Sequence, residues 1–134
     1  MSTVRSLVFS AITGSSALNT LGINSNTCWA AGSFDGPKDG PFMILRWGPV
    51  AKGIGPVNSS TLIMYVHDKG AADYSRINAI LLAVRTVLLG LSATGPAINW
   101  INDVAWLGDG GELNDPLYGT LVRSGEFRVT ANTL

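Results

Sequence analysis

The sequence predicts a single α+β domain in which two helices cover a mostly antiparallel sheet. Apolar residues recur at helical spacing in two segments, 3–13 and 73–91. Runs rich in β-branched and aromatic residues lie between these segments and after the second one. The order helix, strands, helix, strands is typical of an α+β domain. The chain of 134 residues suits one hydrophobic core, so we expect residues 1–134 to form one domain.

The first helix is predicted over residues 3–13. Its apolar positions are Val4, Leu7, Val8, Ala11 and Ile12. The hydroxyl of Ser2 or Thr3 could cap it by accepting a free backbone N–H. Residues 15–22 predict a short second helical turn, and Gly22 is a suitable stop because glycine readily adopts the left-handed conformation.

The middle of the chain predicts three strands. Residues 27–32 form a weak strand, and 42–48 and 60–67 form two strong ones. Glycine, proline and aspartate cluster in 33–41, which predicts a loop. The segment 48–60, "GPVAKGIGPVNSS", is also rich in glycine and proline and is expected to be the connection of a long hairpin.

Residues 73–91 give the clearest helical pattern in the chain. The residues at steps of three or four are Tyr74, Ile77, Leu81, Val84, Leu88 and Leu91. Asp73 stands at the N-terminal end, where a carboxylate caps free N–H groups and interacts favourably with the helix dipole. We expect this helix to anchor the core, since each fully buried aliphatic side chain contributes roughly 1.5–3 kcal/mol.

Two strands are predicted after this helix, at 97–108 and 120–131, with a turn-rich loop between them and a bulge at Gly125. Strict alternation in the first of these strands separates its apolar residues into two sets. Trp100, Val104 and Trp106 would face one side, and Ile101, Ala105 and Leu107 the other.

The chain carries little charge for a protein that has no membrane span. Charged residues make up 13% of it, against about 25% in a typical soluble domain, and nine Lys and Arg balance nine Asp and Glu. The most apolar segment, 79–91, contains Arg85 and is shorter than the roughly 20 residues that a spanning helix needs. No membrane association and no strong binding to nucleic acid backbone are therefore expected. The surplus apolar surface predicts permanent association with other subunits.

The titratable residues do not form a recognisable catalytic or metal-binding motif. His67, the only histidine, is interpreted as a strand-end residue, Asp68 as part of a turn and Asp73 as a helix cap. One histidine with scattered aspartates does not supply the three or four suitably spaced ligands of a metal site. We expect no catalytic residue, cofactor or metal. The competing hypothesis is an enzyme or ligand-binding module with a site around His67, Asp68, Asp103 and Asp109.

Cys28, the only cysteine, is expected to be a small buried hydrophobe.

The connection at 48–60 is the candidate interaction site. It carries Val50, Ile54 and Val57 among its glycines and prolines, with Lys52 as its only charge. A solvent-exposed loop is normally polar, so these four residues are candidate assembly contacts. An ordinary flexible loop remains the alternative.

Taken together, several segments resemble the tail terminator proteins of long-tailed, siphovirus-type phages of actinobacteria. The resemblance spans nearly the whole chain. It rests on "VRSLVFSAI", on "PFMILRWG", on "VHDKGAADYSRINAILLAVRTVL" and on the closing pattern "W-L-G-D…D…Y-G-T-L-V-R-S-G-E-F-R-V". These are packing patterns, and none of them is a catalytic signature.

The resemblance implies a structural role in the virion. Members of that family form a homo-hexameric ring that caps the completed tail tube, ends its elongation and docks to the head connector or stopper protein. DNA passes through the central hole at ejection without sequence-specific binding. The chain would then be assembled in the host cytoplasm and would lie at the head-proximal end of the tail. The neighbouring stopper and adaptor proteins, and the tail tube protein with its related fold, are the alternatives.

Overall fold

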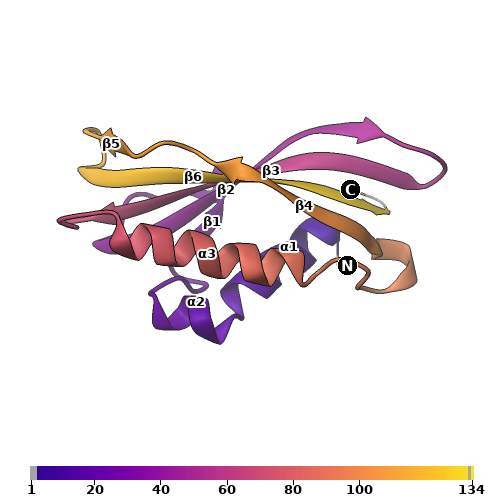
Figure 1. The fold of residues 1–134 in the computed structure, drawn as a ribbon, viewed down its shortest axis with the longest axis horizontal. Helices are drawn as coiled ribbons and strands as arrows, with labels where there is room; N and C mark the ends of the chain where they lie inside the picture. The colour runs from indigo at the N-terminus through magenta and orange to yellow at the C-terminus, as the bar shows by residue number, and fades with distance from the viewer. Residues whose placement is uncertain (1–2, 133) are drawn as a thin grey trace.

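The computed structural model describes residues 3–132 and 134. Within them, three α-helices lie on one side of a six-stranded sheet, so the predicted α+β class is confirmed (Figure 1). The helices are α1 (Val4–Thr13), α2 (Ser16–Thr20) and α3 (Ser75–Leu89). The strands are β1 (Cys28–Ala30), β2 (Gly40–Lys52), β3 (Val57–Lys69), β4 (Ile101–Asp109), β5 (Leu113–Asp115) and β6 (Thr120–Asn132), and Ala31–Ser33 and Ala97–Asn99 form 3-10 turns.

The sheet is mostly antiparallel. Its order is β1-β2-β3-β6-β4, and β5 pairs with the start of β6 beside this path. The short β1 is parallel to β2, and the other pairs are antiparallel. None of the helices in the described part of the chain has the length and apolar character that a membrane crossing requires.

The two N-terminal helices form as the sequence predicts. Thr3 caps α1, because its hydroxyl accepts from the backbone N–H of Ser6 at 3.1 Å while the Ser6 hydroxyl accepts from the N–H of Thr3 at 2.8 Å. Ser2, the other candidate cap, lies outside the described residues. After α2, Gly22 has a φ of +94°, and glycine adopts that backbone conformation at little cost.

Helix α3 begins at Ser75, two residues later than predicted. Asp73 still helps to start it, because its carboxylate accepts from the N–H of Ser75 at 3.0 Å, although the cap position itself belongs to Tyr74. The fully buried face consists of Ile77, Ile80, Leu81, Val84 and Leu88. Ile80 was absent from the predicted face. Tyr74 and Leu91 lie at the margin of the core, where they pack only partly buried.

The core lies between these helices and one face of the sheet. Along β3, Leu62, Met64 and Val66 are fully buried on the helix side. Gly125 of β6 pairs with Met64, and a Cβ built at this glycine would stand 3.1 Å from Leu81 Cδ2. The absence of a side chain at Gly125 therefore lets α3 approach the sheet closely.

The predicted connection at 48–60 is wrong for most of its length. Strands β2 and β3 continue through it and pair from Val50 opposite Ser60 to Lys52 opposite Asn58, which leaves only residues 53–56 as the turn. Gly55, with a φ of +63°, makes this tight turn possible. The glycine and proline signal was misleading because Gly48 and Pro49 form a β-bulge between Trp47 and Val50 rather than a loop.

Pro49 is tolerated in β2 because this part of the strand is an edge. Strand β1 pairs with β2 only at residues 43–45, so residues 46–52 have a partner on one side only. A proline lacks the N–H that a central strand would donate and is confined to such edges and bulges. The bulge and the open edge therefore lie at the same place.

Strand β4, the opposite edge, also departs from the predicted pattern. Its register against β6 shifts between Ile101 and Asp103 and again between Trp106 and Gly108. The first bulge turns Ile101 to the same side as Val104, and both are buried. The predicted grouping of Ile101 with Ala105 and Leu107 is therefore wrong.

The predicted bulge at Gly125 is also wrong, because the β3–β6 register runs without interruption.

Candidate assembly surface

The face of the sheet away from the helices carries a cluster of aromatic rings, formed by Trp29, Phe34, Phe42, His67 and Tyr118. The imidazole of His67 is parallel to the Phe42 ring, with their centroids 4.7 Å apart. Tyr118 approaches His67 edge-on at 5.6 Å, and Phe34 stacks on Phe42 at 5.7 Å. These contacts join β2, β3 and two loops on the open face.

His67 lies in β3 as predicted, but it does not end the strand, which continues to Lys69, and it is 5% exposed. Its Nδ1 forms a hydrogen bond with the Thr120 hydroxyl at 2.8 Å. Burial lowers the pKa of the imidazole below its ordinary value, and the nearby Asp115 charge acts weakly in the opposite direction. The packing, the hydrogen bond and the pKa all describe a neutral structural histidine.

Asp68 lies in β3 and is fully buried, so its assignment to a turn is wrong. Its carboxylate accepts two hydrogen bonds from Arg76 of α3, from Nε at 2.8 Å and from Nη2 at 2.6 Å. These bonds raise the pKa of the Arg76 guanidinium. Neighbouring residues in a strand point to opposite faces. His67 and Asp68 therefore do not form a catalytic pair.

The other two residues of the competing enzyme hypothesis also lie apart. Asp103 is exposed opposite Thr130. Asp109 accepts from the indole N–H of Trp106 at 3.2 Å and lies 3.7 Å from the guanidinium of Arg85. Among residues 3–132 and 134, the structure brings together no group of three or more His, Cys, Asp or Glu side chains that could hold a metal ion.

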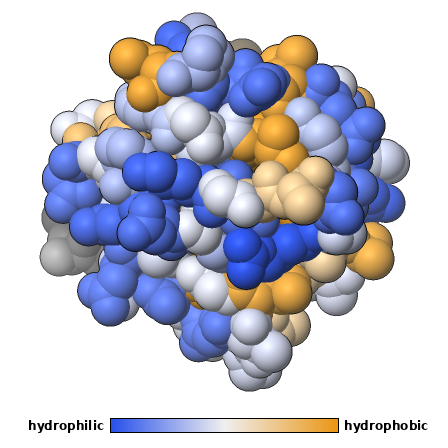
Figure 2. All heavy atoms as spheres, turned by 90° about the vertical axis from the view of Figure 1, so that its left-hand side faces the viewer, coloured by the Kyte–Doolittle hydropathy of each residue, from blue (hydrophilic) through white to orange (hydrophobic). Residues whose placement is uncertain are grey.

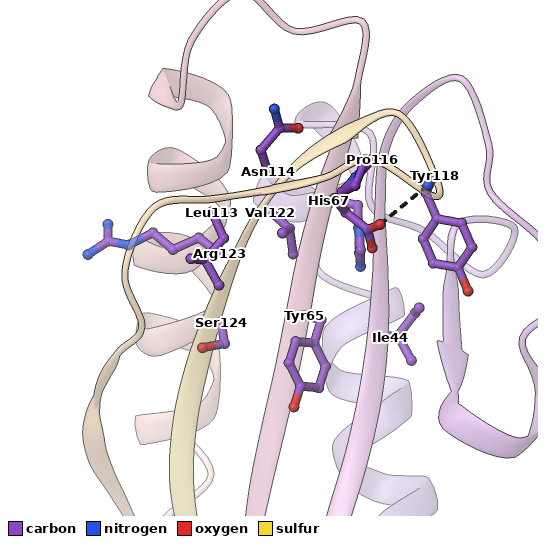
Figure 3. Close-up of a pocket in the computed structure, with 11 residues that line it drawn as sticks. Ile44, Tyr65, His67, Leu113, Asn114, Pro116, Tyr118, Val122, Arg123 and Ser124 are labelled. Atoms are coloured by element: carbon purple, nitrogen blue, oxygen red, sulfur yellow. Dashed lines mark hydrogen bonds between the residues drawn. The ribbon is translucent and has the colours of Figure 1, made fainter.

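An open cavity of about 400 Å³ lies on the open face beside this aromatic cluster (Figure 3). We call it the β5 cavity. Its lining residues are Ile44, Tyr65, His67, Leu113, Asn114, Asp115, Pro116, Tyr118, Val122, Arg123 and Ser124. The sheet supplies the floor, and the segment 113–118 passes over it.

The segment over the cavity is held in shape by Asp115. Its carboxylate accepts from the N–H of Leu117 at 3.0 Å and from that of Tyr118 at 3.4 Å, the bond dashed in Figure 3. The guanidinium of Arg123 points away from the cavity in the same view and donates to the Gly110 carbonyl at 2.7 Å. Sequence reasoning missed this cavity. Alternation along 60–67 places Tyr65 and His67 on one face of the sheet. No local sequence pattern predicts that the segment 113–118 passes over them.

The four predicted contact residues lie on the β2–β3 hairpin. Ile54 is at the turn and is 92% exposed, Val50 is 43% exposed and Lys52 is exposed. Val57 is half-buried opposite Asn132 in the sheet. In Figure 1 this hairpin extends to the right-hand end of the molecule, and β5 lies at the left-hand end.

The end that carries β5 has a mixed surface. Seen end-on in Figure 2, hydrophobic patches interrupt a largely hydrophilic surface. Leu113 and Leu117, on the segment over the β5 cavity, are 62% and 83% exposed. Both ends of the long axis therefore present apolar side chains to solvent.

A second groove, of about 460 Å³, runs between α1 and the β1–β2 edge. The Arg5 guanidinium lies 5.3 Å from the Trp47 ring centroid at this groove. Cys28 also lines it and is buried, as predicted, and burial raises the pKa of its thiol to about 12. A thiol with this pKa carries almost no thiolate at neutral pH and is chemically inert.

No protein-family model and no curated protein matches the sequence. The fold, however, is similar to a solved one: a chain in the structure described as "Virion of native gene transfer agent (GTA) particle" superposes with a TM-score of 0.70. The match covers 93% of this chain and 91% of that chain, at 16% sequence identity. The complete α+β domain described above is thus a fold also found in that virion.

Proposed function

We propose that this chain is a structural protein of a phage-like virion, and specifically a tail terminator. The observation that carries the proposal is the similarity in fold to a chain of a gene transfer agent virion, because it covers nearly all of both chains. The resemblance of the sequence to tail terminators supplies the finer role.

The surface of the chain supports an assembly role. Charged residues make up only 13% of the sequence, and apolar side chains are exposed at both ends of the long axis. The residues of the competing enzyme hypothesis lie apart from one another. The carboxylate of Asp68 accepts its two hydrogen bonds from Arg76 on the helix side of the sheet. Contact between two different ends of identical subunits is heterologous, and such contacts close into rings when the rotation per subunit allows it.

In this role the chain forms a homo-hexameric ring at the head-proximal end of the tail. One face of the ring caps the last ring of tail tube protein and ends elongation, and the other binds the connector or stopper protein of the head. DNA passes through the central hole without sequence-specific contacts. A stopper, an adaptor or a tail tube protein is the second candidate, because a shared fold is compatible with each of these neighbouring positions.

The test uses purified protein and isolated tail tubes from the phage that encodes it. Light scattering and electron microscopy should show hexameric rings, either free in solution or only at the ends of tubes. A terminator binds one end of a tube and stops its growth. A tube protein would polymerise into tubes by itself, and a stopper or adaptor would bind heads and leave tube length unchanged. A monodisperse monomer that never joins tails would contradict the proposal.

A further inference from the structure

We propose that adjacent copies of this chain are joined by insertion of the hairpin tip of one copy, residues 52–56, into the β5 cavity of the next. The inference rests on the proposed function in so far as that function requires a ring. It adds the surfaces through which the ring closes. The occupant of the cavity is a second copy of the chain, and Ile54 is the side chain that enters.

The hairpin tip has the form of an anchor. Ile54 is 92% exposed. A single exposed aliphatic residue on a flat surface is normal and needs no explanation. Here the residue is held at the end of two paired strands. Its carbonyl accepts from the N–H of Val57 at 3.2 Å, and the N–H of Gly53 donates to the Val57 carbonyl at 2.9 Å. Because these bonds hold the backbone of the turn, little backbone conformational freedom is lost when the tip binds.

The β5 cavity has the form of a matching pocket. Its floor includes Ile44, Tyr65 and Val122, which offer an apolar surface to an aliphatic side chain, and the segment 113–118 lines the cavity from above. The cavity of about 400 Å³ falls within the range of pockets that bind small groups, roughly 300–1,000 Å³. Anchors that fill such pockets supply most of the energy of many protein interfaces.

Charge and position favour a second copy over other occupants. Lys52 stands two residues before Ile54 on the tip, and Asp115 lines the cavity, so insertion brings opposite charges together. Strand β5, whose residues line the cavity, and the β2–β3 hairpin tip lie at opposite ends of the long axis (Figure 1). Each copy thus carries one tip and one cavity, and successive copies can use both.

The test is site-directed cross-linking between copies. The variant carries Ile54→Cys on the tip and Ser124→Cys in the cavity, a substitution that replaces one oxygen by sulfur. The matched control carries Ile54→Cys with Ser16→Cys, an exposed serine at the start of α2 on the helix side. The native Cys28 stays in both, because it is buried. Because Ile54→Cys removes part of the anchor, both proteins are assembled at a concentration more than tenfold above the one the parent needs, rings are checked by electron microscopy, and the protein is oxidised with diamide. Products are then separated by denaturing electrophoresis without reductant.

A ladder of covalent oligomers from the Ser124→Cys variant, at least tenfold stronger than from the control, is the expected result. Rings visible by electron microscopy without such a ladder would overturn this inference and leave the terminator proposal intact. Equal ladders from both proteins would overturn it as well, because contact would then be random. If the parent protein forms no rings in solution or on tubes, both proposals fail.

Discussion

The two faces of the sheet use the same strands for different purposes. On the helix side, Leu62, Met64 and Val66 of β3 are fully buried. On the open side, Tyr65 is half-buried, and His67 is covered by aromatic rings and hydrogen-bonded to Thr120. Successive residues of one strand point to opposite faces. The same strand can therefore supply the core with one set of side chains and a binding surface with the other. The largest changes in unfolding are therefore expected from the helix side, and the largest changes in association from the hairpin tip and the open face.

The largest effect on stability is expected at Leu81, on the buried face of α3. Leu81→Ala should lower the free energy of unfolding by roughly 2–5 kcal/mol, because a cavity remains where the side chain packed. The matched control is Leu82→Ala one residue away, where the side chain is 58% exposed and the change should stay within about 0.5 kcal/mol. Urea unfolding of both variants measures the difference. Equal losses would mean that the helix face is assigned wrongly.

A smaller loss is expected when the pair between α3 and β3 is broken. Arg76→Ala leaves the buried Asp68 carboxylate without its two donors and should cost about 1–3 kcal/mol, moderated because the Arg76 side chain is 47% exposed to water. Adding Asp68→Asn to this variant removes the buried charge. The double variant should therefore be more stable than the sum of the single changes predicts, and additive losses in a denaturation cycle would refute the coupling.

The open face should make stability sensitive to mild acid through His67. Its pKa in the folded protein is lowered below the ordinary value of 6.5, so between the two pKa values the unfolded chain binds more protons. Stability is therefore retained above about pH 6.5 and falls as the pH drops toward the folded pKa, by at most about 1.4 kcal/mol per pH unit. His67→Gln should flatten this slope in urea titrations. An unchanged slope would assign the acid sensitivity to another group.

The smallest effect on stability, and the largest on assembly, is expected at the hairpin tip. Ile54→Ser should change the free energy of unfolding by less than about 0.5 kcal/mol, since the side chain is 92% exposed. Ring formation, followed by sedimentation, should need at least roughly tenfold more protein if Ile54 is an anchor. Leu82→Ser on the helix side is the control and should assemble normally. Unchanged assembly of the Ile54 variant would reduce the tip to an ordinary turn.

The elements with strong periodic patterns could be predicted from the sequence, and the irregular ones could not. Helices α1 and α3 follow apolar spacing that tertiary packing does not override. The hairpin was misread because Gly48 and Pro49 are typical of both loops and bulges, and only pairing with β3 distinguishes them. The sides of β4 were misread for the same reason, since one bulge near Ile101 reverses the alternation.

The candidate site could be predicted only in part. The sequence singled out Lys52 and Ile54, because an apolar residue in a glycine-rich turn stands out locally, and the structure places both at the exposed hairpin tip, while their role as contacts stays a prediction. Val50 and Val57 were expected beside them in a loop, but both lie in paired strands. The β5 cavity depends on residues far apart in the chain, such as Ile44 and Asp115, and their proximity is a property of strand order rather than of any local pattern.

The bulges at the two sheet edges also bear on how the protein behaves before assembly. Open strand edges are templates for uncontrolled growth of sheets from molecule to molecule. Here Pro49 removes a donor from the exposed stretch of β2, and two register shifts distort β4. Pairing of one copy's sheet edge with that of another copy is therefore less favourable here than at a regular open edge.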